Sequence, residues 1–224
     1  MNDTSFRLVQ AGDSVVVVEL EDRIDERINA QALDLARAVE AERLAGVRDI
    51  VPTYRSVAVY FDPLRTDYAR LCDLLSAHAR ERSADIPGAF RTGVRSPVRI
   101  PVRYGGQDGP DLAGVAVLAK LPEAEVIARH TGRVYRVFMM GFLPGFPYLG
   151  TVDPAIAAPR HATPRLKVPA GSVGIAGSQT GIYPTESPGG WQLIGRTAVK
   201  LFDLSRPDAF LLQPGDAVEF YAEH

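Results

Sequence analysis

The chain has 224 residues, of which 46% are hydrophobic and 23% are charged, and its formal net charge is −2. This length and apolar share suffice for one large core or two modest ones, so they predict a folded protein of one or two domains. The balanced charge, without a long run of one sign, excludes nucleic acid or an anionic membrane as the main expected partner. The start of the chain has no signal-peptide pattern and Cys72 is the single cysteine, so a cytoplasmic location is expected.

The first part of the chain, residues 1–83, has the periodicities of a small α/β domain. Two pairs of short apolar runs flank turn residues and predict hairpins, and each pair is followed by a stretch with helical spacing of apolar residues. The predicted elements are strands 6–9 and 14–20, a helix over 24–44, strands 49–53 and 56–61, and a helix over 68–79. The order ββαββα predicts a two-layer α/β domain.

Residues 84–97 lose this periodicity and gain proline and glycine, which is typical of a linker. The next part, residues 98–224, opens with a strictly alternating strand. Its remaining predicted elements are helices over 111–119 and 122–130 and strands over 134–140, 172–176, 192–194, 198–202 and 217–221. Many short strands separated by turns favour a small barrel or sandwich.

Residues 141–195 hold half of the 20 glycines and 8 of the 17 prolines. Because proline presets φ and glycine admits otherwise forbidden angles, this density predicts long, stiff loops of the kind that often carry function. The stretch GFLPGFPYLG at 141–150 is predicted to be neither helix nor ladder strand.

Polar side chains in these loops predict an anion site. Arginine presents a planar fork suited to a carboxylate or phosphate, so several arginines that converge would bind such a group. The candidates for substrate binding are Arg160, Arg165, Gln179, Tyr183 and Arg196. For each arginine a structural role, such as tying loop carbonyls, stays open. Tyr148, Tyr183 and Trp191 are expected either to wall a cleft or to pack the loops onto the barrel.

His130 is the acid–base candidate, because histidine titrates near neutral pH and Glu186 would be its partner if the two met in a cleft. A histidine at a helix C-terminus is also common for capping reasons alone. The sequence contains no G-x-x-x-x-G-K-[ST] phosphate loop, and its four histidines have no metal-ligand spacing. We therefore expect no metal site and no nucleotide-binding motif in this chain.

Three segments together, YRVFMMGFLPGFPYLG, PRHATPRLKVPAGSVGIAGSQTGIYPTESPGGWQLIGRT and LLQPGDAVEF, closely resemble the family variously described as 5-oxoprolinase B subunits, KipI-like kinase inhibitors or allophanate hydrolase subunit 1. The resemblance implies an α+β protein with an N-terminal α/β domain and a C-terminal cyclophilin-like β-barrel. It also implies that the Gly-Pro-aromatic loop faces a pocket or a second polypeptide. The residues concerned are Phe142, Pro144, Phe146, Tyr148 and Trp191.

The function implied by the resemblance is that of one component of an ATP-dependent 5-oxoprolinase, a hydrolase complex that opens the lactam of 5-oxoproline to glutamate. The implied partners are the A and C subunits of that complex, the latter resembling a biotin-dependent carboxyltransferase of the allophanate hydrolase subunit 2 family. ATP would be used by the complex, and this chain alone is expected to be inactive. Two alternatives stay open: a KipI-like inhibitor of a sensor histidine kinase, and one component of an amide hydrolase acting on allophanate or a urea-derived amide.

Overall fold

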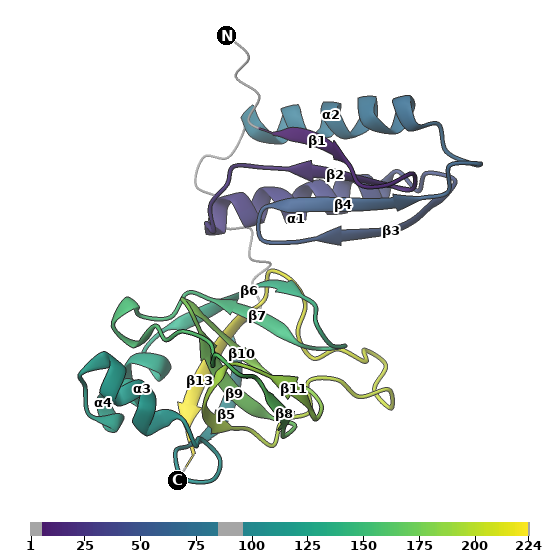
Figure 1. Ribbon diagram of the computed structural model, residues 1–224. Helices are drawn as coiled ribbons and strands as arrows, with labels where there is room; N and C mark the ends of the chain where they lie inside the picture. The colour runs from purple at the N-terminus through teal and green to yellow at the C-terminus, as the bar shows by residue number, and fades with distance from the viewer. Residues whose placement is uncertain (1–5, 85–95, 224) are drawn as a thin grey trace. The chain divides into compact units, whose positions relative to one another are not determined.

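The computed structural model describes residues 6–84 and 96–223, and the chain divides into two compact units, Met1–Arg91 and Thr92–His224 (Figure 1). The predicted linker at 84–97 falls largely outside the described residues and stays a prediction. No helix within the described ranges is long and apolar enough to cross a membrane.

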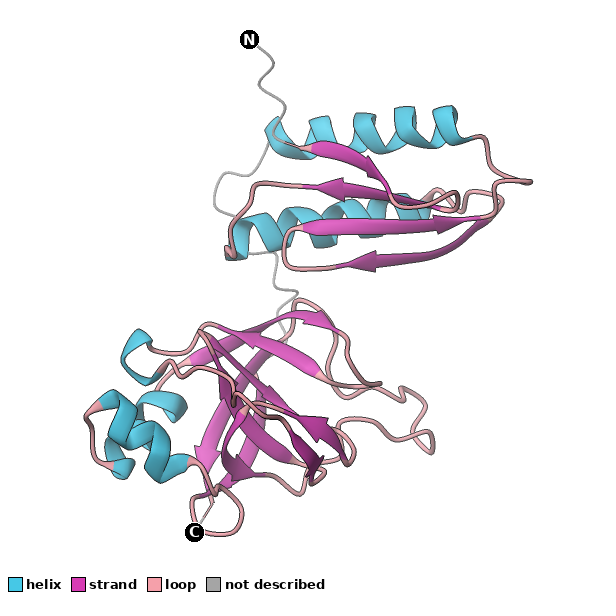
Figure 2. Cartoon of the chain, viewed as in Figure 1, coloured by secondary structure: helices cyan, strands magenta, loops and turns pink. Residues whose placement is uncertain are grey.

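The first unit is a four-stranded antiparallel sheet with two helices, as Figure 2 shows. Its sheet order is β1-β2-β4-β3. The elements are β1 (Arg7–Gln10), β2 (Val15–Glu19), α1 (Glu26–Ala41), β3 (Val47–Pro52), β4 (Ser56–Phe61) and α2 (Tyr68–Ala84). The predicted ββαββα order is confirmed.

Alternation of side chains in the two central strands builds the core of this unit. Val16 and Val18 of β2 and Val57 and Val59 of β4 are fully buried, and they pack in one cluster with apolar residues of both helices. Both helices therefore cover the same face of the sheet. Helix α1 begins later than predicted: Asp25 caps it, and Ile24, predicted to lie on its buried stripe, is 50% exposed.

The second unit is a closed seven-stranded barrel with the order β10-β7-β6-β13-β5-β12-β9, accompanied by a two-stranded sheet of β8 and β11. This barrel confirms the predicted fold class. Its strands and helices are β5 (Val98–Tyr104), α3 (Leu112–Ala119), α4 (Glu123–Thr131), β6 (Val134–Met140), β7 (Pro147–Gly150), the 3-10 turn η1 (Pro154–Ile156), β8 (Arg165–Val168), β9 (Ser172–Ala176), β10 (Gln179–Ile182), β11 (Ser187–Gly189), β12 (Gln192–Arg196) and β13 (Ala217–Ala222).

Several sequence-based predictions about this unit were wrong. Residues 165–168, 179–182 and 187–189, within the stretch expected to form loops, are the strands β8, β10 and β11. Residues 147–150, expected to be loop, form β7 through pairing with β6 and β10. Pro147 stands at the first position of this strand, where proline is tolerated. Residues 198–202, expected to be a strand, lie in irregular backbone, and only Phe202 makes an isolated bridge, to Phe210.

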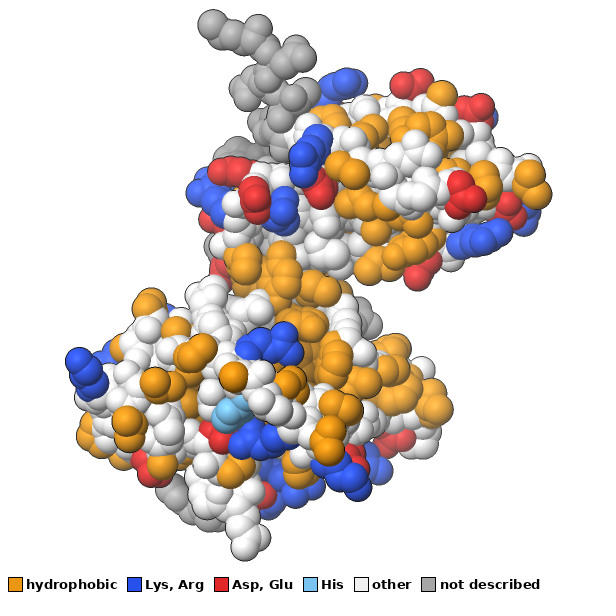
Figure 3. Space-filling model, in the orientation of Figure 1, with side chains coloured by type: hydrophobic (Ala, Val, Ile, Leu, Met, Phe, Trp, Pro, Cys, Tyr) orange, Lys and Arg blue, Asp and Glu red, His pale blue; other side chains and the backbone are white. Residues whose placement is uncertain are grey.

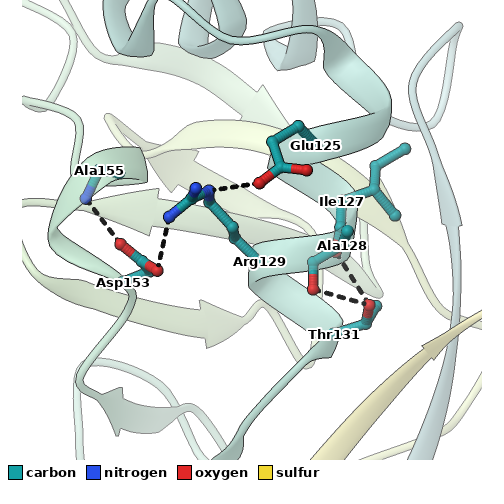
Figure 4. A network of polar contacts seen from close by, with 7 residues as sticks. All are labelled: Glu125, Ile127, Ala128, Arg129, Thr131, Asp153 and Ala155. Carbon is teal, nitrogen blue, oxygen red and sulfur yellow. Dashed lines mark hydrogen bonds and ion pairs between the residues drawn. The ribbon is translucent and has the colours of Figure 1, made fainter.

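A polar network fixes the chain after β7 against helix α4 (Figure 4). Arg129 donates from Nε to Glu125 at 2.8 Å and from Nη1 to Asp153 at 3.0 Å. Asp153 also accepts a bond from the backbone N–H of Ala155, at the start of η1. This network anchors the segment that leads from the barrel towards Pro159, Arg160 and Pro164, which line the candidate site.

Candidate functional site

A pocket of about 640 Å³ opens on the barrel unit where its glycine- and proline-rich loops meet. Seven of the residues predicted from the sequence line it: Phe142, Phe146, Tyr148, Arg160, Gln179, Tyr183 and Trp191. The other lining residues, which the sequence reasoning missed, are Pro159, Pro164, Ala176, Gly177, Pro188, Gly189 and Gly190. On the visible face of this unit, hydrophobic side chains are interspersed with Lys and Arg side chains (Figure 3).

Aromatic rings form one wall of the pocket. The ring of Phe146 is buried, and its centroid lies 5.2 Å from that of Tyr183, 5.4 Å from Trp191 and 4.9 Å from Tyr148, all at steep interplanar angles. Such edge-to-face contacts stabilise a rigid cluster beyond the burial of area. The Tyr183 ring can lie against the backbone of Gly189 because glycine has no side chain. A Cβ at this position would lie 2.4 Å from the Tyr183 hydroxyl.

Arg160 is the cation of the pocket. Its side chain is exposed, and within the described ranges its guanidinium has no hydrogen-bond or ion-pair partner. Burial raises the pKa of both Tyr148 and Tyr183, and the positive charge of Arg160 opposes this rise at each phenol. A guanidinium beside apolar rings, without a protein carboxylate, is suited to bind a carboxylate or phosphate of a ligand.

Asp111 organises the segment next to Arg160. Its carboxylate accepts bonds from Arg165 Nη2 at 2.6 Å, His161 Nε2 at 3.1 Å and the N–H of Leu193 at 2.7 Å. Burial alone would raise the pKa of Asp111, but these donors hold it below its usual range. Asp111 therefore ties residues 161–165 to strand β12.

Arg165 contacts Asp111 and does not line the pocket, contrary to the role predicted for it. Its Nη2 is occupied by the carboxylate, whereas Nη1 is buried and has no acceptor among the described residues. The guanidinium thus has one donor bound inside the protein and one donor that still requires an oxygen.

The predicted acid–base role of His130 is incompatible with its position. The imidazole is fully buried within the barrel, where it contacts Tyr104 and Thr180 and stacks on Phe220 with centroids 4.7 Å apart. It does not line the pocket. His130 lies in the last turn of α4, on the buried side of the helix, and it packs there as a core residue.

Three further predicted residues lie away from the pocket lining. Glu186 is exposed and lies 3.5 Å from Lys167, whereas His130 is fully buried, so the two do not meet in the pocket. Arg196 donates from Nε to the carbonyl of Ala170 at 2.9 Å, which is the structural alternative considered for it. Pro144 belongs to the loop before β7 but is not among the lining residues.

Within residues 6–84 and 96–223, no three His, Cys, Asp or Glu side chains are grouped so that they could hold a metal ion. The pocket lining combines an aromatic wall with the unpaired guanidinium of Arg160, and the Asp111 cluster neighbours it. These features fit a small organic anion.

The fold is that of carboxyltransferase-domain proteins. Residues 6–212 match the family model described as "Carboxyltransferase domain, subdomain C and D", and the chain belongs to this family, within the group of 5-oxoprolinase B subunits. The resemblance noted from the sequence is thereby confirmed. The chain is 40% identical to the 5-oxoprolinase B subunit of Bacillus subtilis over 222 residues, which cover 96% of this chain and 92% of that protein. It is 39% identical to the protein of the same name from Haemophilus influenzae, with 97% and 98% of the two chains covered.

Solved structures agree with the fold. TTHA0988 superposes with a TM-score of 0.81 at 40% identity, over 94% of this chain and 40% of that chain. The urea amidolyase of Saccharomyces cerevisiae is 28% identical over 99% of this chain but only 14% of its own length. Some relatives thus contain a segment similar to this whole chain as a small part of a longer polypeptide.

Proposed function

We propose that this chain is the B subunit of a 5-oxoprolinase, a complex that opens the lactam ring of 5-oxoproline to give glutamate with the hydrolysis of ATP. Relatives of 39–40% identity and nearly full coverage are named as 5-oxoprolinase B subunits, which supports the proposal. The observation that carries it is the unpaired Arg160 at an aromatic pocket, since 5-oxoproline is a small ring with one carboxylate.

The pocket supplies binding and leaves other tasks to partner polypeptides. A volume of about 640 Å³ exceeds what a five-membered lactam fills, so room remains for groups contributed by a second chain. Hydrolysis of an unstrained lactam needs coupling to ATP, and the sequence has no phosphate loop. We therefore assign ATP use to the assembly formed with the A subunit and the carboxyltransferase-like C subunit of the complex.

A urea-type amide is the second candidate substrate. Relatives named urea amidolyase match 95–99% of this chain at 27–28% identity, which favours an amide of that class over unrelated substrates. A lactam and a urea-derived amide both present a carbonyl bonded to nitrogen, so the same pocket chemistry would serve either.

The test is an assay of the assembled complex. The tagged chain would be isolated with its co-purifying partners, and ATP hydrolysis and glutamate release would be measured with 5-oxoproline, allophanate and urea in parallel. We expect 5-oxoproline-dependent glutamate formation only when the partners are present. Turnover of allophanate or urea alone would move the assignment to the second candidate, and recovery of a histidine kinase as the sole partner would contradict both.

A further inference from the structure

Gln179 is a half-buried polar residue on the outer face of the barrel strand β10. Side chains alternate along a strand, and Thr180 points into the barrel, where its hydroxyl contacts His130. Gln179 and Gly181 therefore face outwards, and Gln179 is among the residues that line the pocket. The neighbouring strands β7 and β9 both pair with Gln179, so its backbone is held from two sides.

The aromatic wall of the pocket lies over the same face of this strand. A Cβ on Gly181 would lie 3.0 Å from ring atoms of both Phe146 and Trp191, so the missing side chain lets the two rings approach β10. Gln179 is two residues before Gly181, which places their Cα atoms about 6.6 Å apart in an extended strand. A small ring that contacts the aromatic wall is therefore within reach of the Gln179 side chain.

A lactam has the hydrogen-bonding groups that a glutamine side chain complements. Because its ring holds the amide cis, the N–H and the C=O of a lactam lie on one edge, as a donor beside an acceptor. The glutamine amide offers an acceptor oxygen beside a donor nitrogen, so the two amides can pair through two hydrogen bonds. Among the described residues that line the pocket, Gln179 is the one with an amide side chain. An amide has two N–H donors and two acceptor lone pairs, so Gln179 can bind a ligand and keep a contact within the protein.

We propose that Gln179 is the residue that selects a cis amide in this pocket. Its side-chain oxygen accepts the ring N–H of the lactam, and its side-chain nitrogen donates to the lactam carbonyl. The inference rests on the proposed function, which supplies the lactam as the ligand. Arg160 binds the carboxylate of the same molecule, and the aromatic wall packs against its ring carbons. The carbonyl oxygen keeps its second lone pair for the groups with which the partner polypeptides couple ring opening to ATP.

Two ligands and three variants isolate this pairing. In the lactone analogue of 5-oxoproline an oxygen replaces the ring N–H, while the carboxylate and the carbonyl are retained. Gln179→Met removes both polar groups of the amide and keeps the length of the side chain. Gln107→Met is the matched control, because Gln107 is exposed on the same unit and does not line the pocket. Arg160→Ala removes the carboxylate contact, which the two ligands share.

The experiment measures the Kd of each ligand from the fluorescence of Trp191 in the full chain, with thermal unfolding as the check of folding. We expect the unmodified chain and Gln107→Met to bind the lactam about 10- to 100-fold more tightly than the lactone, because the lactone places an oxygen lone pair against the Gln179 oxygen. In Gln179→Met this preference should disappear. In Arg160→Ala both ligands should bind more weakly while the preference persists.

The outcomes separate this inference from the proposed function. A preference for the lactam that survives in Gln179→Met, or that is absent from the unmodified chain, would overturn the inference. So would an unmodified chain that binds neither ligand while its assembled complex opens 5-oxoproline, since the lactam would then bind elsewhere. A chain with the expected preference whose assembled complex does not open 5-oxoproline would support the inference and contradict the proposed function.

Discussion

The hydroxyl of Tyr104 lies 2.7 Å from Nδ1 of His130 inside the barrel. On its other side His130 lies 2.9 Å from the hydroxyl of Thr180, which itself donates to the carbonyl of Gly174. Thr180 must therefore accept from Nε2, and Tyr104 must donate to Nδ1. This chain of bonds satisfies a neutral imidazole completely, and burial lowers the pKa of His130 from 6.5 to about 3.

The first prediction concerns the pH dependence of stability. Below pH 6.5 the unfolded chain binds a proton at His130 that the folded chain does not bind, so the free energy of unfolding falls as the pH falls from 6.5 towards 3. The slope due to this residue is about 1.4 kcal/mol per pH unit within that window. Replacing His130 by Gln should remove this slope, although the variant is less stable at pH 7. Urea unfolding at several pH values between 7 and 4 measures it. Parallel curves for the two proteins would contradict the prediction.

The regular elements were predictable because a single repeating pattern specifies each one. A run of four valines defines β2, alternating valines define β4, and helical spacing defines α1. Strands were missed where glycine and proline interrupt or flank the pattern. β7 reads as a loop because its four residues include Pro147 and Gly150, and its strand character comes from pairing with β6 and β10. That pairing is a property of the closed barrel, which no local stretch contains.

The aromatic residues of the pocket and Arg160 could be predicted as site residues because they all fall within one loop-rich region of the sequence. The Asp111 cluster could not, since His161 and Arg165 are separated from Asp111 by 50 and 54 residues. His161 stands in a segment whose arginines are the more obvious candidates, and His130 has the more suggestive position because it precedes the loop. Only the packing of α4 shows that His130 points into the core.

The second prediction uses Trp191, the single tryptophan of the chain, as a reporter of binding. Because Trp191 lines the pocket beside Phe146 and Tyr148, a bound ligand should change its fluorescence. We expect 5-oxoproline to give a saturable change, and Arg160→Ala to raise the Kd about 10- to 100-fold by removing a charge-assisted contact.

Arg196→Ala is the matched control for this titration, since Arg196 contacts the carbonyl of Ala170 and does not line the pocket. Its Kd should equal that of the unmodified chain. Equal weakening by both substitutions would mean that the effect of Arg160 is a general effect of net charge.

The third prediction is that Asp111 supports the stability of the barrel unit. Asp111→Asn weakens two charge-assisted contacts and leaves Arg165 without its counter-ion, so we expect a loss of about 2–4 kcal/mol at pH 7. Since the folded pKa of Asp111 is depressed below 3.8, its contribution is present above that pH and is lost as the pH falls through the folded pKa. The difference between the two proteins should therefore shrink at acid pH.

Urea unfolding at pH 7 and near pH 3 checks this, with Asp34→Asn as the control. Asp34 pairs with Arg37 on the surface of α1, where the change should cost no more than about 0.5 kcal/mol. A cost for Asp111→Asn as small as that of Asp34→Asn would show that the cluster does not hold the segment 161–165.

The fourth prediction concerns Phe142 at the mouth of the pocket. Its backbone has φ of 65°, which costs a residue with a Cβ about 1–2 kcal/mol, and the residue is 59% exposed. The ring contacts Phe146 and Tyr183 edge-on, with centroids 5.5 and 6.3 Å away. A strained, exposed aromatic residue at this position is explained if the ring contacts the ligand or a partner polypeptide and does not stabilise the fold.

Phe142→Ala and Phe142→Gly separate these two effects, because both remove the ring and only glycine also relieves the strain. We expect the glycine variant to be the more stable by about 1 kcal/mol, despite the greater freedom of glycine in the unfolded chain. Ligand affinity and recovery of the co-purifying partners should fall equally in both. If alanine were as stable as glycine at this position, the backbone would not be left-handed in solution. If both variants bound ligand and partners like the unmodified chain, the exposed ring would have no role at the pocket.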